Sequence, residues 1–231
     1  MTTVLQSLRR PAAPCRVPSL RAVSPADGHD PRALERWCRD GGLVWVAEDV
    51  YLPVDVASTP AARREALALL TPSGATVAMA TAVWCRGGPG LAARLPFAAD
   101  DGRPRVELLV AGGRSPRPPR PQVRTRQSAL ASHQVERLGP VRVTTGARTA
   151  VDLARWGAGV PDEEALAWLW AHAVTPRAAG ALLRDQRRSP GVRRVRRVLA
   201  AVRDGDPHPL DVAVDDGAPA DGPGHAAAGT R

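Results

Sequence analysis

The sequence contains no lysine, so all 32 of its basic residues are arginine. Together with abundant Ala, Gly and Pro, this pattern is what a GC-rich coding bias produces, so any single arginine is weaker evidence for a function. The net charge of +9 still creates a field that attracts polyanions, among which nucleic acid is the commonest partner. A solvated basic surface explains the same charge, so composition alone leaves both interpretations open.

Cysteine and aromatic residues are also scarce. The three cysteines, Cys15, Cys38 and Cys85, lie far apart and form no CxxC pair. This spacing argues against a structural zinc site or a disulfide framework, and it fits reduced thiols in the cytoplasm. Because there are only six Trp, one Tyr and one Phe, we expect a core filled mostly by short aliphatic side chains.

Long apolar runs are absent as well. The first 15 residues lack the unbroken apolar stretch of a signal peptide, and no later run approaches the roughly 20 apolar residues of a membrane span. The sequence therefore predicts a soluble, cytoplasmic protein without a membrane partner. At 231 residues the chain is long enough for one or two domains.

Pattern and composition predict a helix-rich α+β fold in four parts. The C-terminal part is dominated by Gly, Pro, Ala and Asp, a composition that cannot bury enough surface to offset the entropy lost on ordering. The four predicted parts are a flexible lead-in at 1–18, a winged helix-turn-helix-like domain at 19–58, an α+β domain ending in helices at 59–204 and a disordered tail at 205–231.

The winged helix-turn-helix prediction depends on three elements. SLRAVSPAD predicts a short first helix, weakened by Pro25, which removes a hydrogen bond from its interior. DPRALERWCRD predicts the second helix, with Asp30 as N-cap and a proline at the first helical position. LVWV and VYLP then predict a hairpin, the wing, whose tip carries Glu48 and Asp49.

The second domain shows helical and strand patterns in alternation. AARREALALL predicts a helix, and the nearly all-apolar ATVAMATAVWC predicts a second, buried helix that ends at RGGPG. Strands are expected at PRVELLV, at 122–126 and at 141–143. Three further helices are expected at DEEALAWLWAHA, TPRAAGALLRDQRR and GVRRVRRVLAAV, since each begins at a cap or proline.

The phrase VRVTTGARTAVDLAR joins a strand to a helix. We expect Thr144 or Thr145 to cap that helix, and Arg148 and Asp152, at i and i+4, to pair on its outer surface. A helix N-terminus can hold an anion, but with no lysine and a single glycine we interpret this turn as structural.

The order of these elements resembles the actinobacterial AbiEi-type antitoxins of type IV toxin-antitoxin systems. The resemblance covers roughly residues 32–203 and rests on EDVYLP, on PRVELLV and above all on VRVTTGARTAVDLAR. It implies a DNA-binding transcriptional regulator that is not an enzyme, represses its own operon and opposes a nucleotidyltransferase-like toxin. Double-stranded DNA and a cognate toxin would then be the partners, without a cofactor or metal.

Two alternatives remain open. Many proteins of that family continue into a domain resembling very-short-patch-repair endonucleases, opening with a phrase like SPLE, where this chain has HPLD at 208–211. Asp211, Asp215 and Asp216 stand among Gly and Pro without a scaffold to hold a catalytic metal, so the chain can be a truncated, inactive relative of such proteins. A protein adaptor that presents SPRPPRP as a proline-rich ligand is the other alternative.

The candidate DNA contacts are arginines in two places. Arg32, Arg36 and Arg39 lie off the apolar stripe of the second predicted helix, where arginine can bind guanine edges or phosphates. The acidic wing tip argues against this, because its carboxylates repel phosphate. The second place is the Arg/Pro segment, a stiff ribbon suited to a phosphate backbone or an acidic protein face, and equally well explained as an exposed loop; its candidates are Arg117, Arg120 and Arg124.

A third basic cluster is less informative. Arg193, Arg194, Arg196 and Arg197 fall on both sides of an apolar stripe of valine and leucine, which is typical of an amphipathic surface helix. We therefore expect a surface helix here, with DNA contact as the less favoured interpretation.

Overall fold

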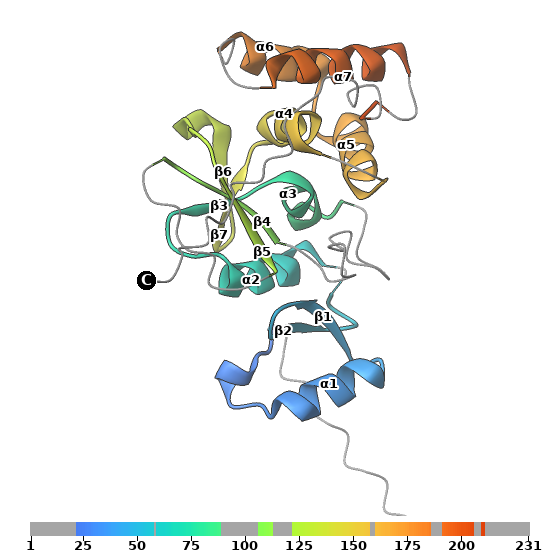
Figure 1. The fold of residues 1–231 in the computed structure, drawn as a ribbon. Coiled ribbons are helices and arrows are strands. Elements are labelled where there is room, and N and C mark those ends of the chain that lie inside the picture. Colours follow the sequence, from blue (N-terminus) through green and yellow to red (C-terminus); the bar gives the residue numbers. More distant parts are fainter. Residues whose placement is uncertain are drawn as a thin grey trace, which may run out of the picture.

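The computed structural model describes residues 22–57, 59–88, 106–112, 122–157, 160–185, 191–205 and 209–210. Within these ranges the chain forms α-helices and two β-sheets, so the predicted α+β class is confirmed. Figure 1 shows the elements stacked from helix α1 (Pro31–Arg39) at one end to helices α6 (Pro176–Asp185) and α7 (Val192–Asp204) at the other. The predicted lead-in and Cys15 lie outside the described residues, as does the predicted tail beyond Leu210.

Helix α1 and the hairpin form where the sequence predicts them. The Asp30 carboxylate accepts a hydrogen bond from the Arg32 amide at 3.1 Å, and Pro31 occupies the first turn. Strands β1 (Leu43–Ala47) and β2 (Val50–Pro53) pair antiparallel. Leu34 is fully buried between the helix and the hairpin, in contact with Val23 and Leu43.

The predicted first helix of a helix-turn-helix is wrong for residues 22–27; its first three residues lie outside the described ranges. Val23 instead forms a β-bridge with Tyr51 through two backbone hydrogen bonds of 2.9 and 3.0 Å, and a short 3₁₀ turn, η1 (Pro25–Asp27), follows. Pro25 lacks an amide hydrogen, so this segment gains more from pairing with the hairpin than from a helix interrupted by proline.

The hairpin is buried on both faces. Leu43 and Tyr51 face α1, whereas Val46, Val50 and Leu52 belong to the main core of the molecule. On that second side β2 contacts helix α2 (Pro60–Leu70), whose first turn is capped by Thr59. The hairpin is thus a platform between α1 and the rest of the protein, which leaves α1 as the outermost layer (Figure 1).

A five-stranded mixed sheet forms the centre of the molecule. Its spatial order is β5-β4-β3-β7-β6. Strands β3 and β4 are antiparallel, as are β6 and β7, while β3 with β7 and β4 with β5 run parallel. The strands are β3 (Ala75–Val77), β4 (Val106–Val110), β5 (Val123–Gln127), β6 (Val135–Leu138) and β7 (Val141–Thr144).

Three of these strands were expected, and two were not. The apolar run ATVAMATAVWC divides into β3 and helix α3 (Met79–Cys85), so the prediction of one helix is wrong over 75–78. The division follows from position: β3 lies between β4 and β7, and its residues are buried, so a short continuous apolar run suits a central strand. Strand β6, which follows a 3₁₀ turn η2 (Ser132–Gln134), lies at the sheet edge and carries two charged residues.

The C-terminal helices cover the sheet on the side of α3. Helices α4 (Gly146–Trp156) and α5 (Val160–His172) contact α3, and α6 and α7 pack on α4 (Figure 1). The predicted apolar stripe of α7 is confirmed, since Val192, Val195 and Leu199 are buried. Leu210, which composition places in the tail, is only 2% exposed and packs in the main core.

Candidate nucleic-acid interface

The three arginines predicted on α1 share one exposed face. At about 100° per residue, Arg32, Arg36 and Arg39 lie within about 60° of one another around the helix axis, on the side opposite the buried Leu34. All three side chains are exposed, and within the described part of the chain none of them forms a salt bridge. Three guanidinium groups therefore project from the outermost helix.

Local electrostatics favour this arrangement. Arg36 and Arg39 stand in the last turn of α1, where the carbonyl end of the helix dipole stabilises positive charge. From Arg32 to Arg39 the helix rises about 10 Å, so the three charges form a short line along its axis rather than a single point.

Acidic side chains lie beside the arginine face of α1. A cavity of about 940 Å³ lies between α1 and the hairpin; three carboxylates line it, together with Arg39 and Tyr51. Burial raises the pKa of the Tyr51 hydroxyl, and the charge of Glu35 raises it further. The carboxylates of this cavity repel a polyanion, which favours contact on the side of Arg32 and Arg36.

The hairpin tip does not project as a free wing. The backbone amide of Glu48 donates to Gln122 Oε1 at 2.5 Å, and the backbone amide of Gln122 donates to Glu48 Oε1 at 2.7 Å. Trp45 Nε1 also donates to the Glu48 carbonyl at 2.6 Å, and Glu48 has a positive φ of 50°. Glu48 therefore does not extend from a free wing, because its carboxylate accepts a hydrogen bond from the backbone amide of Gln122, directly before β5.

Arg124 lies on a different element, in a different electrostatic setting. It is exposed on the edge strand β5, directly opposite Glu107 of β4 in the parallel register. Burial and the charge of Asp162 raise the pKa of Glu107, the positive charges of Arg126 and Arg124 lower it, and the net value is about 8. Arg124 therefore neighbours a carboxylate of the sheet, apart from the arginine face of α1.

The other two candidates in the Arg/Pro segment, Arg117 and Arg120, lie outside the described residues. Their role in binding stays a prediction. Asp211, Asp215 and Asp216, to which the sequence analysis assigns no metal site, also lie outside the described residues. Among the described residues no group of three or more His, Cys, Asp or Glu side chains is placed to hold a metal ion.

The pair Arg148 and Asp152 forms as predicted, but inside the protein rather than on its surface. Both residues are 0% exposed, and Arg148 Nε donates to the two carboxylate oxygens at 3.0 and 2.9 Å. The same guanidinium donates to Gln134 Oε1 and to Ser128 Oγ, both at 2.6 Å. The loop at 128–134 covers this side of α4 and supplies these acceptors, so Arg148 holds the loop to the helix.

The predicted threonine cap of α4 is also wrong. Thr145 is the N-cap residue, yet its side chain makes no capping bond. Thr144 Oγ1 instead lies 2.7 Å from Thr149 Oγ1, and the Thr149 hydroxyl donates to the carbonyl of Thr145 at 2.9 Å. Gly146 is required by packing, because a Cβ there would lie 2.9 Å from Val174 Cγ2. The turn is a structural joint, as predicted, with a different set of bonds.

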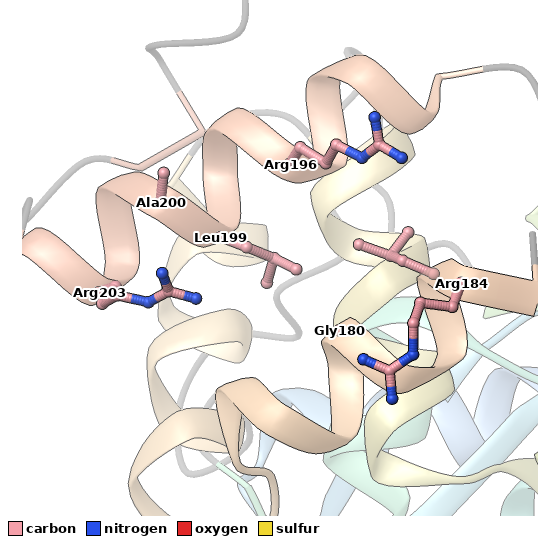
Figure 2. Close-up of a pocket in the computed structure, with 7 residues that line it drawn as sticks. Gly180, Arg184, Arg196, Leu199, Ala200 and Arg203 are labelled. Atoms are coloured by element: carbon pink, nitrogen blue, oxygen red, sulfur yellow. The ribbon is translucent and has the colours of Figure 1, made fainter. Parts of the chain in front are cut away.

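A second exposed basic cluster was missed by sequence analysis. Arg184 of α6 and Arg196 and Arg203 of α7 line one groove between these helices (Figure 2). Arg194, although adjacent in the same basic run, donates to the carbonyls of Gly157 at 2.7 Å and Arg155 at 3.3 Å and so has a structural role. The spacing of apolar residues distinguishes the buried side of α7 from its exposed side, but it cannot show that α6 lies beside α7.

The described chain contains no helix that is both long and apolar enough to cross a membrane. Comparison with models of protein families and with curated protein sequences gives no match for this chain. The resemblance to AbiEi-type antitoxins therefore depends on the sequence phrases that suggested it.

Proposed function

We propose that the protein is a DNA-binding regulator of the AbiEi antitoxin type, and that it contacts double-stranded DNA through the arginine face of α1. The observation that carries the proposal is the exposure of Arg32, Arg36 and Arg39 on one face of the outermost helix. The opposite face of that helix is fixed to the hairpin by Leu34, so the arginines have a rigid support.

The chemistry of this face suits a DNA duplex. The major groove is about 12 Å wide and admits an α-helix, and arginine binds guanine O6 and N7 through two parallel hydrogen bonds or binds phosphate by charge. The net charge of +9 would accelerate the encounter with DNA over longer distances.

Two of the three expected elements of a winged helix-turn-helix, α1 and the hairpin, support this proposal. Where a first helix was expected, the described residues form a bridge to the hairpin, and the hairpin tip is bound to Gln122. The proposal therefore assigns DNA contact to α1 and gives the hairpin the role of a platform.

The biological role that we propose is repression of the protein's own operon in the cytoplasm and opposition to a nucleotidyltransferase-like toxin. The support for this role is the sequence resemblance over roughly residues 32–203. A toxin gene beside the coding sequence is the expected finding; a frameshifted nuclease-coding stretch downstream would instead identify the chain as a truncated relative of the nuclease-bearing proteins.

The test is a double substitution, Arg32→Ala with Arg36→Ala. With a labelled duplex from upstream of the gene, we expect at least about a tenfold loss of affinity in a gel shift, and a decrease of about 2 in the slope of log K against log salt. The matched control is Arg137→Ala with Arg142→Ala, which removes two exposed, paired arginines from β6 and β7. An unchanged affinity in the α1 variant, or an equal loss in the control, would overturn the assignment.

A further inference from the structure

The groove between α6 and α7 combines three positive charges with an apolar floor. It has a volume of about 370 Å³. Figure 2 shows Leu199 and Arg203 extending from α7 toward α6, with Arg184 on the α6 side of the same gap. The lining consists of Gly180, Leu183, Arg184, Arg196, Leu199, Ala200 and Arg203.

These three arginines have no anionic partner within the described chain. Arg184, Arg196 and Arg203 are exposed, and none of them takes part in a salt bridge among the described residues. Arg196 and Arg203 are seven residues apart and so lie on the same face of α7, separated by about 10 Å along its axis. Like charges around one groove repel each other, so an anionic occupant would stabilise the arrangement.

Gly180 is a second, independent feature of the groove. It stands inside α6, where glycine destabilises a helix by about 0.5 to 1 kcal/mol relative to alanine. Its backbone is not in the left-handed region, and a Cβ at this position would meet no atom within 4 Å. Packing therefore does not require glycine here, whereas the missing methyl group deepens the groove and lets another backbone approach α6.

The occupant that fits best is the acidic segment DVAVDD, at residues 211–216. Its three carboxylates match three guanidinium groups in number and sign. In an extended chain side chains alternate, so Val212, Val214 and Asp216 would share one face that could cover the leucines, and Asp211 and Asp215 would lie on the other face. A phosphodiester backbone would match the charge of the rim, but it offers no apolar groups for Leu183 and Leu199.

The position of this segment in the chain also favours it. Leu210, immediately before Asp211, is anchored in the main core, which is the same core on which α7 packs through Val195 and Leu199. Six extended residues reach about 20 Å. A ligand on a short tether that spans the distance to its site has an effective concentration in the millimolar range, at which even a weak interaction keeps the site occupied.

We propose that the α6–α7 groove binds the acidic segment at 211–216 of the same chain, with Arg184, Arg196 and Arg203 paired to its carboxylates. The proposal is independent of DNA binding by α1 and stands or falls on different residues.

The test uses the full chain labelled with ¹⁵N and follows the amide resonances of Gly180 and Ala200. Asp215→Asn with Asp216→Asn should shift both resonances, and about 0.5 M NaCl should shift the wild-type resonances in the same direction, since salt screens these ion pairs. The matched control is Asp49→Asn with Asp55→Asn, which removes two exposed carboxylates near the other end of the molecule and should leave the groove resonances unchanged.

A charge exchange separates binding from a change in the helices themselves. Arg196→Glu with Arg203→Glu should move the Gly180 resonance away from its wild-type position, and adding Asp215→Arg with Asp216→Arg should return it toward that position. Groove resonances that do not respond to the tail substitutions would overturn the proposal. Groove resonances that respond to duplex DNA but not to those substitutions would also overturn it, and would assign the groove to nucleic acid.

Discussion

Near each end of the molecule lies one set of three exposed arginines, and the two sets differ in shape. On α1 the guanidinium groups project from a convex helix whose Leu34, on the opposite face, is buried against the hairpin. Between α6 and α7 they surround a concave groove with leucines in its floor (Figure 2). The same residue type in the same number therefore suits different partners: a projecting row can enter the groove of a duplex, whereas a hollow with an apolar floor can receive a peptide.

A third set of arginines, inside the protein, makes the comparison sharper. Arg63 donates to the carbonyls of Ala57, Trp84 and Gly88 at 3.1 to 3.2 Å, and burial lowers its pKa. Arg148 connects α4 to the loop at 128–134 in the same manner. With five donors in a fixed plane, arginine can satisfy several buried acceptors at once, so a protein without lysine uses it in the interior as well as on the surface.

The largest expected effect is on the free energy of unfolding, and it distinguishes the buried arginines from the exposed ones on α1. Arg148→Ala leaves the Asp152 carboxylate buried without its partner, which should lower the free energy of unfolding by about 3 to 5 kcal/mol. Arg36→Ala, on the exposed face of α1, should change it by less than about 0.5 kcal/mol. Urea denaturation of both variants measures the difference. Similar losses in the two variants would mean that the α1 face has a structural role.

A smaller effect concerns Arg124, the one described candidate that belongs to neither end. Its neighbour Glu107 has a pKa raised to about 8, so between about pH 4.5 and 8 the folded state keeps a proton that the unfolded state has lost. The free energy of unfolding should therefore fall as pH rises through this range, by at most about 1.4 kcal/mol per pH unit.

Glu107→Gln is neutral in both states and should remove this part of the pH dependence. Urea denaturation at pH 5, 6, 7 and 8 compares the variant with the wild type. The variant should gain stability relative to the wild type as pH rises. Parallel curves for the two proteins would show that the Glu107 carboxyl is ionised throughout, with Arg124 and Arg126 as its partners.

The smallest expected effect is the change in stability when Gly180 is replaced, which tests whether packing within the fold requires this glycine. Gly180→Ala should stabilise the protein by about 0.5 to 1 kcal/mol, because the added methyl group meets open space in a helix. Gly146→Ala is the matched comparison and should destabilise the protein, because its Cβ would lie 2.9 Å from Val174. Thermal unfolding of both variants shows whether each substitution raises or lowers the stability. A loss of stability in Gly180→Ala would give that glycine a packing role.

Local signals predicted most of the elements but few of their contacts. The Asp30 cap, the proline after it and the alternation of LVWV and VYLP act within a few residues, so α1 and the hairpin could be predicted. The run that forms β3 and α3 could not, because a short apolar run is compatible with either structure until its neighbours in the sheet are known.

The candidate binding surfaces were predictable only in part, because local sequence signals do not show which elements lie beside each other. The arginine face of α1 follows from helical spacing, so sequence alone identifies it. Arg148, Asp152 and Arg155 share one side of α4, which sequence alone assigns to the surface; the burial of Arg148 depends on a loop some 15 residues earlier in the chain. The α6–α7 groove needs the pairing of two helices, which periodicity within one helix does not contain.

The most direct test of the account compares two triple variants that remove the same charge from opposite ends. One carries Arg32→Ala, Arg36→Ala and Arg39→Ala, and the other carries Arg184→Ala, Arg196→Ala and Arg203→Ala. In a salt titration of duplex binding, we expect the α1 variant to lose affinity and about 3 units of slope, and the α6–α7 variant to match the wild type. Equal losses in the two variants, or a loss only in the α6–α7 variant, would contradict the assignment of DNA binding to α1.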